Sequence, residues 1–344
     1  MSQDNTKTLL VTGATGFIGS YIVEEALSQG YEVWAAVRST SSRQWLSDPR
    51  IHFINLNLSD RLQMAEAFRQ VCQETGGVGL RYVVHAAGAT KCANADDFHT
   101  INAVGTHNLA LALIDSAMPL ERFVFVSSLS VMGPIHEDYP YTDITDDDTP
   151  CPNTAYGRSK LEAEGYLESL AGQLPYIILR PTGVYGPRER DYFLMAKSIK
   201  GHTDFSVGYR PQDLTFIYVA DMVQAVMLAL TNGQTGHKYF LSDGHVYSSR
   251  TFSDLIHDEL GRPWLLRIKA PLWVLRVVTT VGEYYGRLTG KVSALNADKY
   301  HIMRQRNWRC DIGAAQRELG YTPRYGLAAG VKLSIKWYKD NGWL

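Results

Sequence analysis

A tyrosine and a lysine stand four residues apart in the stretch TAYGRSKLEAE, residues 154–164. On a helix, Tyr156 and Lys160 would project from one face, because side chains at i and i+4 lie one above the other. A free phenol titrates near about 10 and is a poor acid–base catalyst at neutral pH, but an adjacent ammonium lowers its pKa. The pair could therefore exchange a proton with a hydroxyl or carbonyl oxygen. Most Tyr/Lys pairs at this spacing are ordinary helix surface residues, so the hypothesis of proton exchange depends on the surrounding elements.

Glycines occupy the junction between the first strand-like run and the first helix-like run. The run TLLVTG is short and apolar, and VTGATGFIGS places Gly13, Gly16 and Gly19 between it and a helical pattern that stops at Gly30. Glycine permits a positive φ and lets the backbone approach a pyrophosphate closely. A helix N-terminus adds free N–H groups and the positive end of the helix dipole. The three glycines predict a dinucleotide-binding loop; the alternative is a tight turn without ligand.

Short apolar runs alternate with helical patterns in the first half of the chain, which predicts an α/β fold with a Rossmann-type, doubly wound parallel sheet. The expected strands lie within residues 8–13, 31–38, 51–58, 81–88, 122–128 and 176–183. The helical patterns lie at 60–74, 99–117, 154–171, 219–231, 251–260, 271–288 and 327–340. The expected domains are a dinucleotide-binding domain, residues 1–180 plus about 212–242, and a smaller C-terminal substrate lobe, about 181–211 plus 243–344.

The composition argues against several classes of protein. A net charge of -1 and 45% hydrophobic residues are typical of a soluble globular chain that does not bind nucleic acid. The four cysteines, Cys72, Cys92, Cys151 and Cys310, are far apart, so neither a metal site nor a disulfide framework is expected. No signal peptide is recognisable, and the most apolar late segment, residues 271–286, is too short for an integral membrane span. A cytoplasmic location is expected.

The glycine spacing and the stretch YGRSK at 156 together resemble the short-chain dehydrogenase/reductase superfamily. At its length the chain is similar to the extended branch, the NAD-dependent epimerase/dehydratase family. The resemblance covers nearly the whole chain and rests on motifs that follow the family order. Those further motifs are HAAGAT at 85, NAVGT at 102, VFVSSLSVMG at 124, LRPTGVYGP at 179, FIYVADM at 216 and WRCDIGAAQRELGYTP at 308.

The resemblance implies a catalytic group of three side chains. Tyr156 exchanges the proton as hydride moves, Lys160 holds the nicotinamide ribose, and Ser128 hydrogen-bonds the reacting oxygen. Ser128 is preferred because the family's catalytic hydroxyl lies five residues before a glycine, here Gly133; Ser127 is the alternative.

The resemblance also implies a set of cofactor contacts. Asn57 and Leu58 stand where the family commonly has an acid that meets the adenine amine, while Asp60 is expected to cap a helix. Asn102 is either a cofactor or supporting contact or a helix cap. The remaining predicted contacts are Gly13, Thr15, Gly16, Phe17, Ile18, Gly19, Ala86, Ala87 and Gly88, together with Tyr156 and Lys160 and, at the nicotinamide carboxamide, Pro181, Thr182 and Val184.

The end of the second strand predicts which nicotinamide cofactor is used. An acid there binds the ribose 2′-hydroxyl of NAD, whereas an arginine accommodates the 2′-phosphate of NADP. The strand ends in AAVRSTSSRQ, which has no acid, and Arg38 with Ser39 is placed to meet the phosphate. NADP(H) is therefore favoured over NAD(H). The alternative is that Arg38 is a solvated residue.

Two departures from the family patterns argue against particular reactions of the family. Sugar-nucleotide dehydratases usually have an Asp-Glu pair after their catalytic hydroxyl, where this chain has Leu129 and Ser130. Sugar-nucleotide epimerases usually carry an arginine for the pyrophosphate just before the FIYVADM strand, where this chain has Leu214 and Thr215. The arginines that could compensate are Arg188, Arg190 and Arg210.

Apolar and aromatic side chains in the C-terminal lobe resemble the branch of 3β-hydroxysteroid dehydrogenases and dihydroflavonol reductases. The expected function is an NAD(P)-dependent oxidoreductase acting on a hydroxyl or ketone of a small, apolar-ring substrate. The alternatives are a nucleotide-sugar epimerase and a non-catalytic NADP-binding redox sensor, and the aromatic residues could simply be core. They are Tyr185, Tyr192, Phe193, Met195, Trp264, Leu272, Trp273, Tyr284 and Tyr285.

Two expectations concern partners other than the small-molecule substrate. Relatives commonly pair through the NAVGT and YGRSK helices, so a homodimer is expected. The amphipathic segment 271–288 could cap the substrate pocket or make a peripheral contact with a membrane surface.

Overall fold

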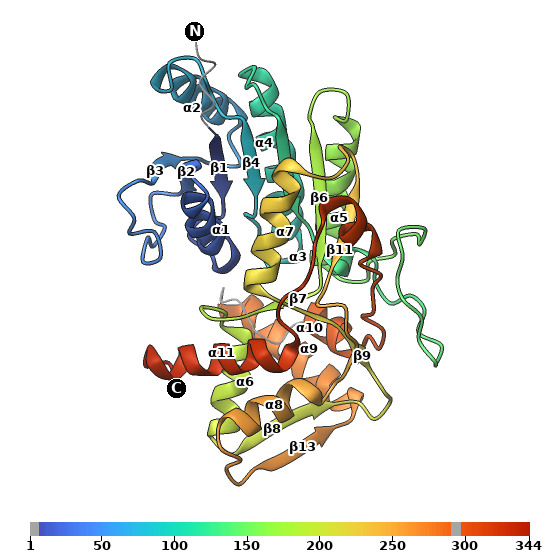
Figure 1. The fold of residues 1–344 in the computed structure, drawn as a ribbon. Helices are drawn as coiled ribbons and strands as arrows, with labels where there is room; N and C mark the ends of the chain where they lie inside the picture. Colours follow the sequence, from blue (N-terminus) through green and yellow to red (C-terminus); the bar gives the residue numbers. More distant parts are fainter. Residues whose placement is uncertain (1–6, 290–296) are drawn as a thin grey trace.

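Seven parallel strands form the central sheet of the protein (Figure 1). The computed structural model describes residues 7–289 and 297–344, without the side chains of residues 283–289. The strands are β1 (Thr8–Thr12), β2 (Glu32–Val37), β3 (His52–Asn55), β4 (Tyr82–His85), β5 (Arg122–Val126), β6 (Tyr176–Pro181) and β11 (Lys238–Leu241). Their order across the sheet is β11-β6-β5-β4-β1-β2-β3. The predicted Rossmann-type α/β fold is confirmed; β11 is not among the strands that the sequence predicts.

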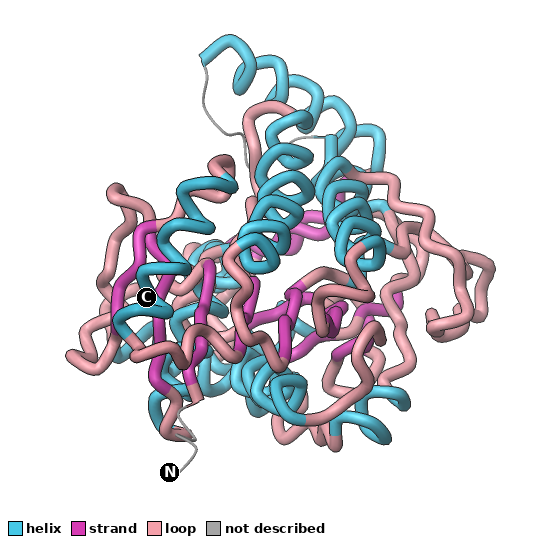
Figure 2. The backbone as a smooth tube through the Cα atoms, turned by 90° about the horizontal axis from the view of Figure 1, so that it is seen from above, coloured by secondary structure: helices cyan, strands magenta, loops and turns pink. Residues whose placement is uncertain are grey.

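Helices cover both faces of the sheet, as the view from above shows (Figure 2). One face carries α1 (Phe17–Ser28) and α7 (Val219–Thr231), and the other carries α2 (Arg61–Glu74), α4 (Gly105–Asp115) and α5 (Ala155–Ser169). Leu9 and Val11 of β1 pack in the first layer and Leu10 in the second, because successive strand residues point to opposite faces. Burial on both faces explains why these strands are unbroken apolar runs in the sequence.

Most of the C-terminal half of the chain forms helices and two-stranded sheets beyond the carboxyl edge of the central sheet (Figure 1). The elements there are β7 (Gly183–Tyr185), α6 (Asp191–Lys200), β8 (Thr203–Val207), β9 (Asp213–Leu214), β10 (Phe216–Tyr218), β12 (Tyr247–Ser248), α8 (Thr251–Glu259), β13 (Leu266–Ala270), α9 (Leu272–Thr289), α10 (Ala297–Arg304) and α11 (Leu327–Asp340). The short η3 (Ala315–Leu319) lies instead beside the start of β11. The strand pairs are β7–β10, β9–β12 and β8–β13. The helices α7, α8, α9 and α11 are predicted by the sequence, whereas α6 and α10 are not.

The carboxyl ends of the central strands point toward this C-terminal half, which is where open α/β sheets bind ligands. The exact boundaries of a dinucleotide-binding domain and a substrate lobe stay a prediction. In the two described ranges of the chain, no helix is both long and apolar enough to cross a membrane.

The glycine loop brings α1 into direct contact with the ends of β1 and β4. A Cβ on Gly19 would lie 2.1 Å from the carbonyl oxygen of Gly13. Gly13 has a φ of +69°, and a Cβ there would lie 2.7 Å from the backbone of Ala86 and Ala87. No other residue type fits these positions without moving the backbone, so the two glycines set the width of the groove at the start of α1.

We predict that Gly19→Ala lowers the free energy of unfolding by roughly 1–3 kcal/mol, because the added methyl group must push α1 off the loop. Gly165→Ala on α5 is the matched control, since nothing lies within 4 Å of an added Cβ there. The control should gain about 0.5–1 kcal/mol from its lower backbone entropy when unfolded. Urea unfolding measures both variants, and a Gly19→Ala protein as stable as the control would contradict the packing described here.

Candidate active site

The helix that carries Tyr156 and Lys160 begins against the turn that follows β5. Thr154 caps α5, and its hydroxyl accepts a hydrogen bond from the N–H of Gly157 at 2.9 Å. Gly157 allows the close approach, because a Cβ there would lie 2.5 Å from the carbonyl oxygen of Ser130. The first turn of α5 is therefore held directly beside the carboxyl end of β5.

The Tyr156 side chain is half-buried and lies beside Ser128, whose hydroxyl donates to Ser130 Oγ at 3.1 Å. Ser128 also caps the short 3-10 turn η2 (Leu129–Val131), its Oγ accepting from the N–H of Ser130 at 3.1 Å. Burial raises the pKa of Tyr156 to about 12, against the lowering effect of the neighbouring Ser128. The Lys160 ammonium is expected to lower this pKa together with the positive nicotinamide ring of the oxidised complex. Here burial dominates and the amine is turned toward other groups, so the lowering in the complex stays a prediction.

Lys160 is buried, and its amine lies at the ends of β4 and β5. Nζ donates a hydrogen bond to the carbonyl oxygen of Val126 at 2.8 Å and lies 4.5 Å from the ring centroid of Phe125. A Cβ on Gly88 would lie 3.3 Å from Nζ, so the amine also adjoins the loop that follows β4. Burial lowers the pKa of Lys160 to about 8, while Glu164, one turn further along α5, raises it. The amine is thus still charged at neutral pH.

Ser127 and Ser128 point to different sides of the chain. The Ser127 hydroxyl donates to the carboxylate of Glu164, which is buried and forms an ion pair with Arg180 at 2.6 Å. Ser128 lies instead on the wall of a cavity. This arrangement supports Ser128 over Ser127 as the hydroxyl that can meet a substrate. It also provides a buried carboxylate behind Lys160, which partly offsets the cost of burying the ammonium.

The groove at the start of α1 has the features that a dinucleotide requires. Gly16 caps α1 and is exposed. Among the described residues, no side chain caps the free N–H groups of the first turn, which include those of Phe17 and Ile18. Thr15 precedes them and is half-buried. Across the groove lie the half-buried Ala86 and Ala87 and the exposed Gly88.

Arg38 and Ser39 are exposed just after β2, and within the described ranges the Arg38 guanidinium has no hydrogen-bond or ion-pair partner. It is therefore free to meet an anion. Asn57 follows β3, where its side-chain oxygen accepts from the N–H of Ser59, and the carbonyl of Leu58 accepts from Asn108. Asp60 caps α2 as predicted, accepting from the N–H of Gln63 at 2.9 Å.

Asn102 joins the loop after β4 to the helix α5. It lies inside a π-helical turn, η1 (His99–Val104), between α3 (Ala95–Phe98) and α4, so the helix-cap alternative is wrong. Its Oδ1 accepts from the N–H of Ala89 at 2.7 Å, and its Nδ2 donates at 3.0 Å to the Ala89 carbonyl and to Ser159 Oγ. Both N–H groups of the side-chain amide are thus used within the protein, and direct cofactor contact by Asn102 stays a prediction.

A buried histidine that the sequence analysis does not single out continues this network. His85 ends β4 and lies between Thr12 Oγ1, at 2.6 Å from Nδ1, and Thr106 Oγ1, at 2.9 Å from Nε2. Thr106 donates its hydroxyl proton to the carbonyl of Asn102, so Nε2 carries the imidazole proton and Nδ1 accepts from Thr12. Burial lowers the pKa of His85 to about 3, with Lys160 adding to the effect, and the ring stays neutral.

A cavity of about 370 Å³ opens beside Ser128. The predicted nicotinamide contacts Pro181 and Thr182 line it, whereas Val184 is half-buried two residues further on, in β7. The Thr182 hydroxyl is buried and, in the part of the chain that the structure describes, has no hydrogen-bond partner. An unpartnered hydroxyl at this place is available to a ligand.

The cavity wall is more polar than the sequence analysis expects. Tyr192 and Met195 line it as predicted, together with Leu214, Phe216 and Trp308. The charged side chains on the wall are Asp204, Arg250 and Lys269.

The other predicted pocket residues lie elsewhere. Tyr185 is buried in the core, and Phe193 packs against Tyr338. Trp264 and Trp273 are 72% and 69% exposed. The side chains of Tyr284 and Tyr285 lie outside the described residues.

A second cavity of about 240 Å³ adjoins the first, with which it shares Gln212 and Met303, and Leu272 lines it. Three arginines line this space, and their guanidinium groups have no hydrogen-bond or ion-pair partner among the described side chains. They are Arg210, Arg304 and Arg306.

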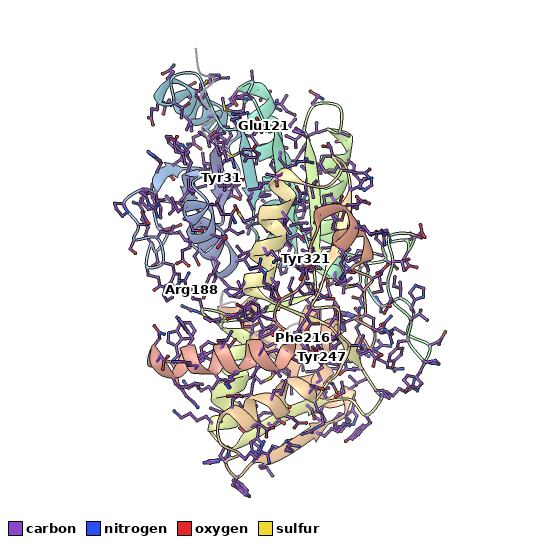
Figure 3. All side chains as sticks on the ribbon, in the orientation of Figure 1. Tyr31, Glu121, Arg188, Phe216, Tyr247 and Tyr321 are labelled. Atoms are coloured by element: carbon purple, nitrogen blue, oxygen red, sulfur yellow. The ribbon has the colours of Figure 1, made fainter. Side chains whose placement is uncertain are left out.

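Arg188, predicted to compensate for the missing arginine, does not line either cavity. It donates to Ser20 and Glu24 of α1 and lies over the ring of Tyr21, beneath α1 and apart from Phe216 (Figure 3). Arg190 is exposed and lines neither cavity.

Comparison with known proteins gives the family. Residues 9–242 match the profile of the NAD dependent epimerase/dehydratase family. The chain belongs to this family. It is accordingly an enzyme of the short-chain dehydrogenase/reductase type, as the sequence predicts.

The curated relatives within the family differ in their reactions. A UDP-glucose 4-epimerase from Vibrio cholerae is 26% identical, over 95% of this chain and 94% of the relative. A 3 beta-hydroxysteroid dehydrogenase/Delta 5→4-isomerase from Mycobacterium tuberculosis is 25% identical, over 96% of this chain and 90% of the relative. The family therefore does not by itself select the substrate.

Solved structures share the fold. The crystal structure of gox2253 has a TM-score of 0.78 at 24% identity and covers 98% of this chain and 99% of its own. DesIV, a dTDP-glucose 4,6-dehydratase from Streptomyces venezuelae, has a TM-score of 0.77 at 24% identity, with 98% of each chain covered. At this identity the likeness supports the architecture alone.

Proposed function

We propose that the protein is an NADP(H)-dependent oxidoreductase that interconverts a hydroxyl and a ketone on a small, largely apolar substrate. The observation that carries the proposal is that Tyr156 lies beside Ser128, which lines the cavity, with the Lys160 amine at the ends of β4 and β5. A phenol, a hydroxyl and an ammonium arranged in this way can remove the proton of an alcohol or donate one to a ketone oxygen.

The residues around the groove fit a dinucleotide: close-packed glycines, uncapped N–H groups on α1, and a buried hydroxyl without a partner at Thr182. When bound, the nicotinamide supplies or accepts the hydride. Gly13, Gly16 and the first turn of α1 would hold the pyrophosphate, and Lys160 would hold the nicotinamide ribose.

The proton steps follow from the chain's own groups. Ser128 orients the substrate oxygen by a hydrogen bond. Tyr156 gives its proton to that oxygen during reduction and takes it back during oxidation. Because burial raises the pKa of Tyr156 to about 12, the phenol is protonated at neutral pH and ready to act as the acid in reduction. Oxidation needs additional positive charge near the phenol to favour the phenolate.

NADP(H) is the proposed cofactor because Arg38 is exposed at the end of β2 and has no partner among the described side chains. An arginine in this position matches a 2′-phosphate in charge and geometry. The family description names NAD, so the proposed preference for NADP rests on Arg38 of this chain.

A nucleotide-sugar epimerase is the second candidate function, and the unpaired arginines beside the catalytic cavity favour it. Arg210, Arg304 and Arg306 could meet a diphosphate in place of the arginine that is absent at Leu214. Oxidised cofactor that stays bound through purification, together with protection against heat by UDP-glucose, would favour this candidate.

The remaining proposals concern the non-catalytic alternative, the oligomeric state and the location of the protein. A non-catalytic redox sensor is disfavoured because Ser128, Tyr156 and Lys160 are all present. A homodimer through α4 and α5 and a cytoplasmic location fit the family and stay predictions, as does a peripheral membrane contact through α9.

We predict that Tyr156→Phe lowers turnover at least about 100-fold, because the variant cannot transfer the proton. NADPH should bind with unchanged affinity, since the groove at α1 is untouched. Oxidation of NADPH in the presence of a panel of apolar-ring ketones measures turnover, and NADPH fluorescence measures binding. Tyr166→Phe is the control on the same helix, where the exposed hydroxyl donates to Glu162. If Tyr156→Phe turned over as fast as this control, the proposed role of Tyr156 in proton transfer would be contradicted.

We predict that Arg38→Ala weakens NADPH binding about 10- to 100-fold while NADH binding changes little, because a charged hydrogen bond to a phosphate is worth about 1.5–3 kcal/mol. Titration of both nucleotides by fluorescence gives the ratio. Arg69→Ala is the control, an arginine paired with Glu66 on the surface of α2. The same loss for both nucleotides would contradict the assignment of Arg38 to the 2′-phosphate.

A further inference from the structure

We propose that Asp298, on α10 of the C-terminal half, is a positioning residue for the catalytic helix α5. Its carboxylate fixes the first turn of α5, and with it Tyr156. The proposal deepens the proposed function, on which it rests only through the role of Tyr156 in proton transfer.

The contact is a two-point hydrogen bond across the molecule. Asp298 Oδ1 accepts from the N–H of Ala155 at 2.9 Å, and Oδ2 accepts from the N–H of Tyr156 at 3.0 Å. The first N–H groups of a helix have no partner within the helix, and Thr154 caps only that of Gly157. Two of these three bonds therefore come from a residue more than 140 positions away in the sequence.

The electrostatics favour the same arrangement. A carboxylate at a helix N-terminus interacts with the positive end of the helix dipole, and hydrogen bonds to a charged acceptor are stronger than neutral ones. Because both oxygens bind successive N–H groups, the contact fixes the rotation of α5 as well as its axial position. A rotation of α5 would move the Tyr156 hydroxyl away from Ser128.

Helix α10 connects this contact to the substrate cavity. Ile302 and Met303, on the same eight-residue helix as Asp298, line the cavity beside Ser128. The neighbouring Lys299 lies 3.7 Å from the carboxylate of Asp191 on α6, and Asp191 also pairs with Lys91. One short helix thus touches both the substrate space and the backbone of the catalytic tyrosine, so a substrate that packs on α10 also steadies α5.

The test compares Asp298→Ala and Asp298→Asn with Asp60→Asn, a variant of the carboxylate that caps α2 away from the cavity. Asp298→Asn keeps one acceptor oxygen and serves if the alanine variant folds poorly. The measurements are turnover with the substrate found for the wild type, NADPH affinity by fluorescence, and hydrogen exchange of residues 154–160 by mass spectrometry.

The expected result is a loss of kcat of roughly 10- to 100-fold in Asp298→Ala and a smaller loss in Asp298→Asn, with unchanged NADPH affinity. Exchange of residues 154–160 should accelerate in both Asp298 variants and not in Asp60→Asn. A variant that keeps wild-type exchange, or that loses no more kcat than Asp60→Asn, would overturn the proposal. Tyr156→Phe separates the two claims: if it keeps turnover, the proposed function fails, while faster exchange in Asp298→Ala still supports the contact with α5.

Discussion

The docking of α5 against the carboxyl end of β5 is the constraint on which the candidate site depends. Gly157 lets the helix approach the carbonyl of Ser130, and the Lys160 amine closes the contact on the carbonyl of Val126. Ser128 belongs to this strand end and Tyr156 to this helix, so the two side chains lie beside each other only while the two elements touch. A larger side chain at position 157 would separate the proton-handling phenol from the hydroxyl that orients the substrate.

Behind this contact, a network of paired polar side chains restricts how far the surrounding elements can move. Thr12, His85, Thr106, Asn102 and Ser159 connect the end of β1 to α5 through hydrogen bonds of 2.5 to 3.0 Å. The buried carboxylate of Glu164 satisfies both Ser127 and Arg180. A buried polar group without a partner is costly, so each member of such a network restricts the position of the next. Among the described residues, the Thr182 hydroxyl is a buried group without a hydrogen-bond partner that lies on the cavity wall.

The sequence predicts the sheet and the catalytic helix well, because their signals are local. Apolar runs between helical patterns identify six of the seven central strands, and the capping residue Asp60 is visible from its position before α2. The sequence does not reveal His85 or Asp298, because their partners lie on other elements and no spacing marks them. The pocket residues are only partly predicted, since an aromatic side chain such as Tyr185 fits a core as well as a ligand wall. The high pKa of Tyr156 is equally a property of tertiary burial.

A crystal structure of the protein with bound NADP⁺ tests the central claim most directly. The account predicts the Lys160 amine at the nicotinamide ribose, and the Tyr156 and Ser128 hydroxyls facing one point beside the nicotinamide C4. A substrate oxygen at that point would place its carbon about 3 to 3.5 Å from C4, a distance suited to hydride transfer. A Tyr156 hydroxyl on the far side of the cavity from C4, or a groove at α1 filled by side chains, would contradict it.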